Sequence, residues 1–273
     1  MSQQDKTRRA IKTIEILHDP NKEYILAFSG GKDSIVIYDL AKKSKVSNII
    51  NYIHSNTTID PPGHLKFIRN NYPDVKIIHP KYSFYKLIEK KGLPTRLTRF
   101  CCQYLKEYVG KNAKVIEGIR LEESITRRTR LSNIKEPEVC DTRIKGKIHV
   151  YPILNWTEKD IWDYIHLNNL TYPIEHYRYN KRMGCVGCPL TTQNNRIKDY
   201  QLYPKYVKAI LQAIRKNIEN EGPLSKRFND EYDAFNWWIS GDSIHIHELK
   251  RDSGFFKIDY KKELQILLRT DII

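Results

Sequence analysis

The stretch Tyr24–Ala41, with the sequence YILAFSGGKDSIVIYDLA, decides the fold of this chain. Its first residues are apolar and predict a buried parallel strand, and its last residues predict the first turns of a helix. The turn between them holds Gly30 and Gly31, which lack the Cβ that would keep the backbone away from an anion. The first amides of the helix point at the same place, where the helix dipole favours negative charge. Residues Ser29–Ser34 therefore predict a phosphate-binding loop, to which Lys32 adds a positive charge.

This loop matches neither of two common phosphate-binding motifs. It lacks the first glycine of GxxxxGK(S/T), and it is not GxGxxG. It is similar to the PP-loop, the pyrophosphate-binding loop of the adenine nucleotide alpha-hydrolase superfamily. That resemblance implies that the phosphate or sulfate of a nucleotide is bound by Ser29, Gly30, Gly31, Lys32, Asp33 and Ser34.

Further along the chain, apolar strands alternate with amphipathic helices. Strands are predicted at 24–28, 48–54, 75–80, 114–120 and 147–153, and helices at 6–17, 35–41, 63–71, 83–91, 158–168, 199–220 and 228–240. The alternation predicts an α/β fold, a doubly wound, Rossmann-like parallel sheet, with a helical C-terminal extension. The predicted parts are an N-terminal helix (1–22), a nucleotide-binding domain with the cysteine site (23–190) and the extension (191–273).

The chain is strongly basic, with 47 Lys and Arg against 32 Asp and Glu and a net charge of +15. This charge indicates either an anionic partner, a nucleotide or a nucleic acid, or the lysine-rich surface of a basic proteome. No apolar run approaches the roughly 20 residues that cross a bilayer. The N-terminus lacks the apolar core of a signal peptide. We therefore expect a cytoplasmic protein with no membrane partner.

Four of the five cysteines form two pairs, Cys101-Cys102 and Cys185-Val186-Gly187-Cys188. Four thiolates in such pairs hold zinc or a 4Fe–4S cluster, and buried or redox-active thiols are the third interpretation. Adjacent side chains diverge, which favours the separate iron corners of a cluster over one zinc ion. The fifth, Cys140, has acidic neighbours that disfavour its thiolate, so we take it as a bystander.

From about residue 22 to 190 the chain resembles the phosphoadenylylsulfate (PAPS) and adenylylsulfate (APS) reductases. The resemblance rests on the PP-loop, on a Gly-Ile-Arg segment at Gly118–Ser124, on Tyr151–Trp156 and on both cysteine pairs. The loop after the second strand departs from the family's Asp-Thr-Gly at two of three positions. The resemblance implies that six further residues bind the nucleotide, in addition to those of the PP-loop: Asn56, Thr57, Gly118, Arg120, Arg127 and Arg130.

The same resemblance implies a sulfur-metabolism enzyme that binds an adenylyl nucleotide beside a 4Fe–4S cluster. Lys32, Asp33 and Arg120 are the implied catalytic residues, and the implied metal ligands are Cys101, Cys102, Cys185 and Cys188. An electron or sulfur donor protein is the implied partner, and self-association stays open.

One departure keeps other functions open. The reductases attack sulfur with a cysteine in a C-terminal segment, but no cysteine follows Cys188 here, so the thiol would come from elsewhere or from Cys140. The first alternative is a superfamily relative that uses ATP and Mg²⁺ to adenylate and thiolate tRNA or DNA. The second is a non-catalytic subunit that binds a nucleotide or nucleic acid and holds a structural zinc.

Overall fold

The computed structural model describes residues 2–123, 129, 138–140 (backbone only), 146–179, 182–252 and 258–271. The chain forms two compact units. The first comprises Met1–Asn56, Pro62–His79 and Glu107–Gly184, and the second comprises Thr57–Pro61, Pro80–Lys106 and Cys185–Ile273. Two internal segments thus belong with the C-terminal part, and the division by chain position at residues 22 and 190 stays a prediction.

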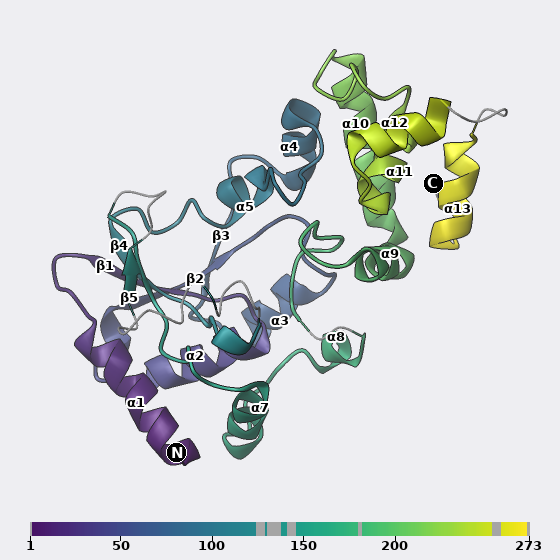
Figure 1. The fold of residues 1–273 in the computed structure, drawn as a ribbon. Helices are drawn as coiled ribbons and strands as arrows, with labels where there is room; N and C mark the ends of the chain where they lie inside the picture. The colour runs from purple at the N-terminus through teal and green to yellow at the C-terminus, as the bar shows by residue number, and fades with distance from the viewer. Residues whose placement is uncertain are drawn as a thin grey trace. The chain divides into compact units, whose positions relative to one another are not determined.

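The first unit is built on a sheet of six strands in the order β3-β2-β1-β4-β6-β5 (Figure 1). Five strands are parallel, and β5 alone pairs antiparallel, with β6. The strands are β1 (Glu23–Ala27), β2 (Ile50–Ser55), β3 (Lys76–Ile78), β4 (Ala113–Ile116), β5 (Glu138–Cys140) and β6 (Ile148–Val150). The predicted parallel α/β sheet is confirmed. The order reverses direction between β1 and β4, the position at which open α/β sheets bind ligands.

Four helices share the core of this sheet: α1 (Gln3–Ile16), α2 (Lys32–Lys42), α3 (His64–Asn71) and α7 (Glu158–Leu167). Helix α8 (Ile174–Tyr179) belongs to the same unit and has no buried residue. The three central residues of β1 are buried, as the apolar run predicted, and one face of α2 joins them through Ile35, Val36 and Leu40. Burial of these side chains fixes the loop between β1 and α2 on a rigid base.

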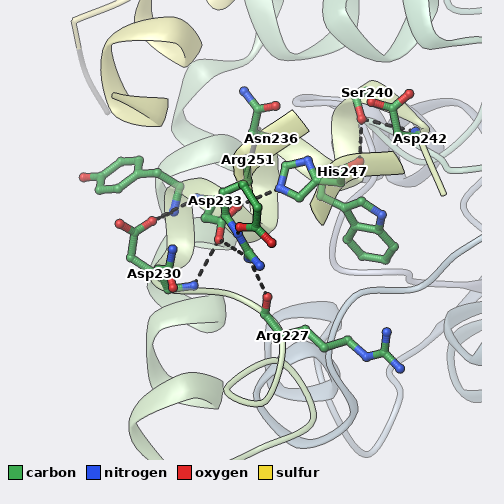
Figure 2. Close-up of polar contacts among 12 residues, drawn as sticks. Arg227, Asp230, Asp233, Asn236, Ser240, Asp242, His247 and Arg251 are labelled. Atoms are coloured by element: carbon green, nitrogen blue, oxygen red, sulfur yellow. Dashed lines mark hydrogen bonds and ion pairs between the residues drawn. The ribbon is translucent and has the colours of Figure 1, made fainter. Parts of the chain in front are cut away.

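The second unit is helical among its described residues and has its own apolar core. Its helices are α4 (Phe84–Lys91), α5 (Phe100–Leu105), α9 (Gln193–Leu202), α10 (Pro204–Glu219), α11 (Glu231–Ser240), α12 (Ile244–Asp252) and α13 (Tyr260–Leu268). Helix α10 packs against α4 and α11, which joins the segment before the first cysteine pair to the C-terminal helices. On α11 and α12, Asp233 lies between His247 and Arg251 in a polar cluster (Figure 2).

Two predicted elements differ from the structure. The helix expected at 199–220 is broken at Tyr203, whose φ of −130° and ψ of 60° are not helical. Pro204 follows and disfavours the helical conformation of the residue before it, so a new helix begins there. The segment 138–140 forms the edge strand β5, which its acidic sequence did not predict. Across the part of the chain that is described, no helix has the length and apolar character of a membrane span.

Candidate functional site

Two glycines shape the loop between β1 and α2. Gly30 has a φ of +70°, in the left-handed region that residues with a Cβ rarely adopt. A Cβ on Gly30 would lie 2.5 Å from Cε1 of His64, so the loop touches α3 there. Gly31 is the N-cap of α2 and has no side chain to accept from the first N–H groups of the helix. Those N–H groups are therefore directed at whatever lies beyond the loop.

The two serines of the PP-loop stabilise its shape. The Ser34 hydroxyl donates to the carbonyl oxygen of Gly31 at 2.8 Å, and the Ser29 hydroxyl donates to Oγ of Ser34 at 3.1 Å. The Gly31 N–H in turn donates to Oγ of Ser29 at 3.3 Å. Both predicted hydroxyl donors are thus part of a hydrogen-bonded ring within the loop.

The three residues predicted as catalytic form one chain of ion pairs. Nζ of Lys32 lies 3.5 Å from Oδ2 of Asp33, and Nε of Arg120 lies 2.6 Å from Oδ1 of the same carboxylate. The side chains of the two cations are only 4% and 3% exposed. Arg120 also donates to Glu122 at 3.0 Å, and Lys32 lies 3.9 Å from Glu158. Two buried cations therefore share Asp33 at the first turn of α2.

Gly118 brings the loop after β4 against the same turn. A Cβ at this position would lie 2.9 Å from the backbone carbon of Asp33, closer than real contacts allow. Only glycine lets the segment that carries Arg120 approach α2 this closely. The Gly-Ile-Arg segment is thus joined to the PP-loop by backbone packing and by an ion pair.

Tyr177 of α8 is a residue of this site that the sequence did not reveal. Its hydroxyl accepts a hydrogen bond from the Lys32 N–H at 2.7 Å. Its ring packs edge-on against Trp162, with centroids 5.4 Å apart. The contact joins residues 145 positions apart, so no local pattern could have predicted it.

The remaining predicted nucleotide-binding residues are placed differently. Asn56 follows β2 and is buried, with Nδ2 3.0 Å from Nδ1 of His79. Thr57 begins the first segment of the second unit, where its N–H donates to Asp60 at 3.0 Å. Arg127 and Arg130 lie outside the described residues.

All four paired cysteines belong to the second unit, and they are partly exposed and not joined in disulfides. Cys101 and Cys102 lie in α5, and the side chains of this pair hydrogen-bond to each other. Cys185 and Cys188 flank a turn at Gly187, whose φ is +65°. Cys102, Cys185 and Cys188 all contribute to raising the pKa of the Cys101 thiol, so the two pairs lie in one neighbourhood.

The C-x-x-C turn is fixed by hydrogen bonds from three directions. The Val186 N–H donates to the Ile59 carbonyl and the Gly187 N–H donates to Asp199, both at 2.9 Å. Arg96 donates to the carbonyls that follow Cys188, those of Pro189, Leu190 and Thr191, at 3.1 to 3.2 Å. Arg96 precedes the first cysteine pair in the sequence, and its hydrogen bonds reach the segment that follows the second pair.

Burial keeps thiols of this site protonated. A hydrogen bond with Cys102, and then burial, raise the pKa of the Cys101 thiol. Burial, and then the neighbouring Cys185, raise the pKa of Cys188. The charge of Cys185 raises the pKa of the Lys106 ammonium. A metal would lower the thiol pKa values, because thiolates are the ligands.

The donor set fits a thiolate-bound metal centre in its chemistry. Four thiols are the ligands of zinc and of iron–sulfur clusters, and the cations Lys106 and Arg196 interact with them. Within the described ranges, no three His, Cys, Asp or Glu side chains are grouped so that they could hold a metal ion. The assignment of these four cysteines as ligands is therefore still a prediction.

The comparison with family models matches residues 23–191 to the phosphoadenosine phosphosulfate reductase domain. An uncharacterized protein of Methanocaldococcus jannaschii is 29% identical over 220 residues, which are 76% of this chain and 52% of that protein. The adenosine 5'-phosphosulfate reductase of Geobacillus kaustophilus is 28% identical over 188 residues, 63% of this chain and 76% of the relative. A second uncharacterized protein of Methanocaldococcus jannaschii also matches. The chain spans about half the length of these two relatives, 52% of the first and 48% of the second.

Two solved structures are similar to this chain. The PAPS reductase of Candida auris, in a phosphate complex, has a TM-score of 0.47 and 17% identity over 68% of this chain and 96% of that one. The U34-tRNA thiolase NcsA of Methanococcus maripaludis, with its 4Fe–4S cluster, has a TM-score of 0.47 and 16% identity over 94% of this chain and 82% of that one.

Proposed function

The chain belongs to the phosphoadenosine phosphosulfate reductase domain family, and from this premise we propose that it is an enzyme of sulfur metabolism. It binds an adenylyl nucleotide that carries sulfate, APS or PAPS, at the PP-loop of the first unit. It binds a 4Fe–4S cluster at the four paired thiols of the second unit. The observation that carries the proposal is the N-terminus of α2, where the N-cap Gly31 has no side chain and the buried cations Lys32 and Arg120 lie beside it.

In this proposal the PP-loop binds the charged end of the nucleotide. The first N–H groups of α2 meet its oxygens, because the N-cap Gly31 has no side chain to accept from them. At the Lys32 N–H the anion replaces the Tyr177 hydroxyl. Without a ligand, Lys32 and Arg120 both form ion pairs with Asp33. An incoming anion therefore competes with that carboxylate for two positive charges. Arg120 has a forked guanidinium that suits two oxygens at once.

The paired cysteines are proposed as the ligands of the cluster. A 4Fe–4S cluster at this place would supply electrostatic stabilisation of anionic groups. The chain's own contribution is the fixed C-x-x-C turn, which Ile59, Asp199 and Arg96 hold. The thiol that would attack sulfur in a reductase is proposed to come from a partner or from Cys140.

A second function is favoured by the charge of the chain. The net charge of +15 suits a nucleic acid as substrate. Under this alternative, the PP-loop binds ATP with Mg²⁺ and the enzyme adenylates tRNA or DNA before inserting sulfur. Asp33 would then turn from Arg120 to the metal ion.

Equilibrium binding of ATP, APS and PAPS to the anaerobically purified, cluster-loaded protein decides between the two. Tight binding of APS or PAPS with weak binding of ATP supports the reductase. Tight, Mg²⁺-dependent binding of ATP, with release of pyrophosphate only when RNA or DNA is added, supports thiolation. Binding of none of the three contradicts both.

Variants test each half of the proposal. Lys32→Ala should weaken nucleotide binding by about 1.5–3 kcal/mol, the scale of a charged hydrogen bond. Lys66→Ala, on the exposed face of α3, is the matched control and should bind as the wild type does. Cys102→Ser and Cys185→Ser should each lose iron and the brown colour, whereas Cys140→Ser should retain both.

A further inference from the structure

Helix α9 directs two polar side chains into the core of the second unit. Arg196 and Tyr200 lie one turn apart and therefore on the same face of the helix. The residues are 5% and 0% exposed. A guanidinium and a phenol are rarely buried this deeply without partners.

Neither side chain has a hydrogen-bond partner for its buried donors in the described part of the chain. Nε and Nη2 of Arg196 and Oη of Tyr200 are all without one. Cζ of Arg196 lies 4.6 Å over the ring of Trp238, which satisfies the face of the guanidinium but not its N–H edge. Burial of such groups unpaired is costly, so the arrangement calls for an acceptor that the protein itself does not supply.

The Tyr200 hydroxyl lies at the C-x-x-C turn, and Arg196 lies one helical turn before it on the same face of α9. A Cβ on Gly187 would lie 2.0 Å from Oη of Tyr200, so the hydroxyl contacts the middle of the turn directly. Charge on Cys188 acts on Arg196 and on Tyr200 alike. The Gly187 N–H donates to Asp199, which holds the turn onto the same helix. The missing acceptor therefore belongs beside Cys185 and Cys188.

We propose that Arg196 and Tyr200 are positioning residues for an iron–sulfur centre, and that they donate hydrogen bonds to its thiolate or sulfide sulfurs. This inference rests on the cluster half of the proposed function and goes beyond it. Sulfur in a thiolate-bound cluster carries negative charge and accepts hydrogen bonds. Such donors stabilise the reduced, more negative form and so raise the reduction potential.

We expect Tyr200→Phe to affect the thermal midpoint differently with and without the cluster. Without iron the hydroxyl is an unpaired buried group, so its removal should leave the thermal midpoint unchanged or raise it. With the cluster bound the same change removes a hydrogen bond, so the midpoint should fall. A tyrosine with a merely structural role would shift both midpoints in the same direction.

The experiment compares wild type, Arg196→Met, Arg196→Lys, Tyr200→Phe and the control Arg215→Met after anaerobic reconstitution with iron and sulfide. Arg215 lies on α10 and pairs with Glu231. The readouts are iron content, thermal midpoint with and without iron, and reduction potential by redox titration of the visible or EPR signal. We expect a more negative potential in Arg196→Met and Tyr200→Phe, partial recovery in Arg196→Lys and no change in Arg215→Met.

The outcomes separate this inference from the proposed function. If the Met and Phe variants match wild type in iron content, potential and midpoints, the inference is overturned and the cluster stands. If wild type takes up no iron, or holds zinc instead, both the inference and the cluster half of the proposed function are overturned. Nucleotide binding at the PP-loop is tested independently by Lys32→Ala.

Discussion

The hydroxyl oxygen of Tyr177 lies 2.7 Å from the backbone nitrogen of Lys32 and accepts its hydrogen bond. This N–H belongs to the first turn of α2, the group that an anion in the PP-loop would meet. The ring of Tyr177 lies 5.7 Å from the Lys32 ammonium. Burial raises the pKa of Tyr177, so its hydroxyl stays neutral. Helix α8 thus places a neutral acceptor where the proposed ligand places a charged one.

We therefore expect Tyr177→Phe to bind pyrophosphate more tightly than the wild type. The hydroxyl competes with the anion for the Lys32 N–H, and one such hydrogen bond is worth about 0.5–1.5 kcal/mol, or up to about tenfold in affinity. Calorimetric titration with pyrophosphate measures the change. Fluorescence of Trp162, which packs against Tyr177, should report the displacement in the wild type.

Tyr179→Phe is the matched control, because Tyr179 lies on the same helix and is 56% exposed. It should leave pyrophosphate affinity unchanged. Weaker binding in Tyr177→Phe would show that the hydroxyl assists the anion, contrary to this prediction.

The local part of the site was predictable, and the long-range part was not. The turn at Ser29–Ser34 could be predicted from two adjacent glycines between an apolar strand and a helix, because this pattern is contained in a few residues. The ion pair of Asp33 with Arg120 joins residues 87 positions apart, and the sequence assigned both side chains to ligands instead. Tyr177 carried no signal, since a tyrosine on a short helix is ordinary until the fold brings it to the loop.

The carboxylate of Asp160 joins α7 to α1 through hydrogen bonds. Its carboxylate accepts from the Thr157 N–H at 2.8 Å, in the capping box that begins α7, and from Lys6 of α1 at 2.5 Å. Burial alone would raise the pKa of Asp160, but hydrogen bonds from Lys6 and Thr157 outweigh it and lower the pKa below the ordinary 3.8. Stability from this carboxylate is therefore present above pH 3.8 and is lost as the pH falls through its folded value.

Asp160→Asn should accordingly lose about 1 kcal/mol of unfolding free energy at pH 7 and much less near pH 3. Urea unfolding at the two pH values measures the difference. Asp163→Asn, which breaks an exposed pair with Lys159 on the same helix, should cost under about 0.5 kcal/mol. A pH-independent loss in Asp160→Asn would contradict the assignment.

The third prediction concerns the cluster around Asp233 in the second unit (Figure 2). The carboxylate accepts from Nε2 of His247 at 2.7 Å, from Arg251 at 3.3 Å and from the Asn229 N–H at 3.0 Å, and its side chain is 1% exposed. Asp233→Asn leaves the partly buried guanidinium of Arg251, the buried imidazole of His247 and the Asn229 N–H with a weaker acceptor. It should lower the unfolding free energy by about 3 kcal/mol, measured by urea denaturation.

Asp242→Asn is the control for this prediction and lies in the same view (Figure 2). Asp242 pairs with Lys250 at 2.8 Å, but its side chain is 24% exposed. The substitution should cost under about 1 kcal/mol, because solvent screens the pair. Equal losses in both variants would mean that burial does not set the strength of the Asp233 contacts.

The fold itself was predictable where one signal dominated. The apolar run at 24–28 and the helical pattern at 158–168 each act over a short stretch, and both elements, β1 and α7, are confirmed. The single helix predicted at 199–220 was wrong because the apolar spacing continues through Pro204, although Tyr203 leaves the helical conformation. The edge strand β5 is three residues long and pairs only with β6, so nothing local distinguishes it from a loop.

The last prediction concerns Gly187, which joins the C-x-x-C turn to α9. Its φ of +65° disfavours other residues, and a Cβ would lie 2.0 Å from Oη and 2.1 Å from Cζ of Tyr200. That ring is fully buried and cannot move aside, so Gly187→Ala should cost at least about 3 kcal/mol in unfolding free energy. Gly184→Ala is the control, since a Cβ there meets nothing within 4 Å. Thermal unfolding with thiol titration measures both, and equal midpoints for the two variants would refute the close approach of Tyr200 to the turn.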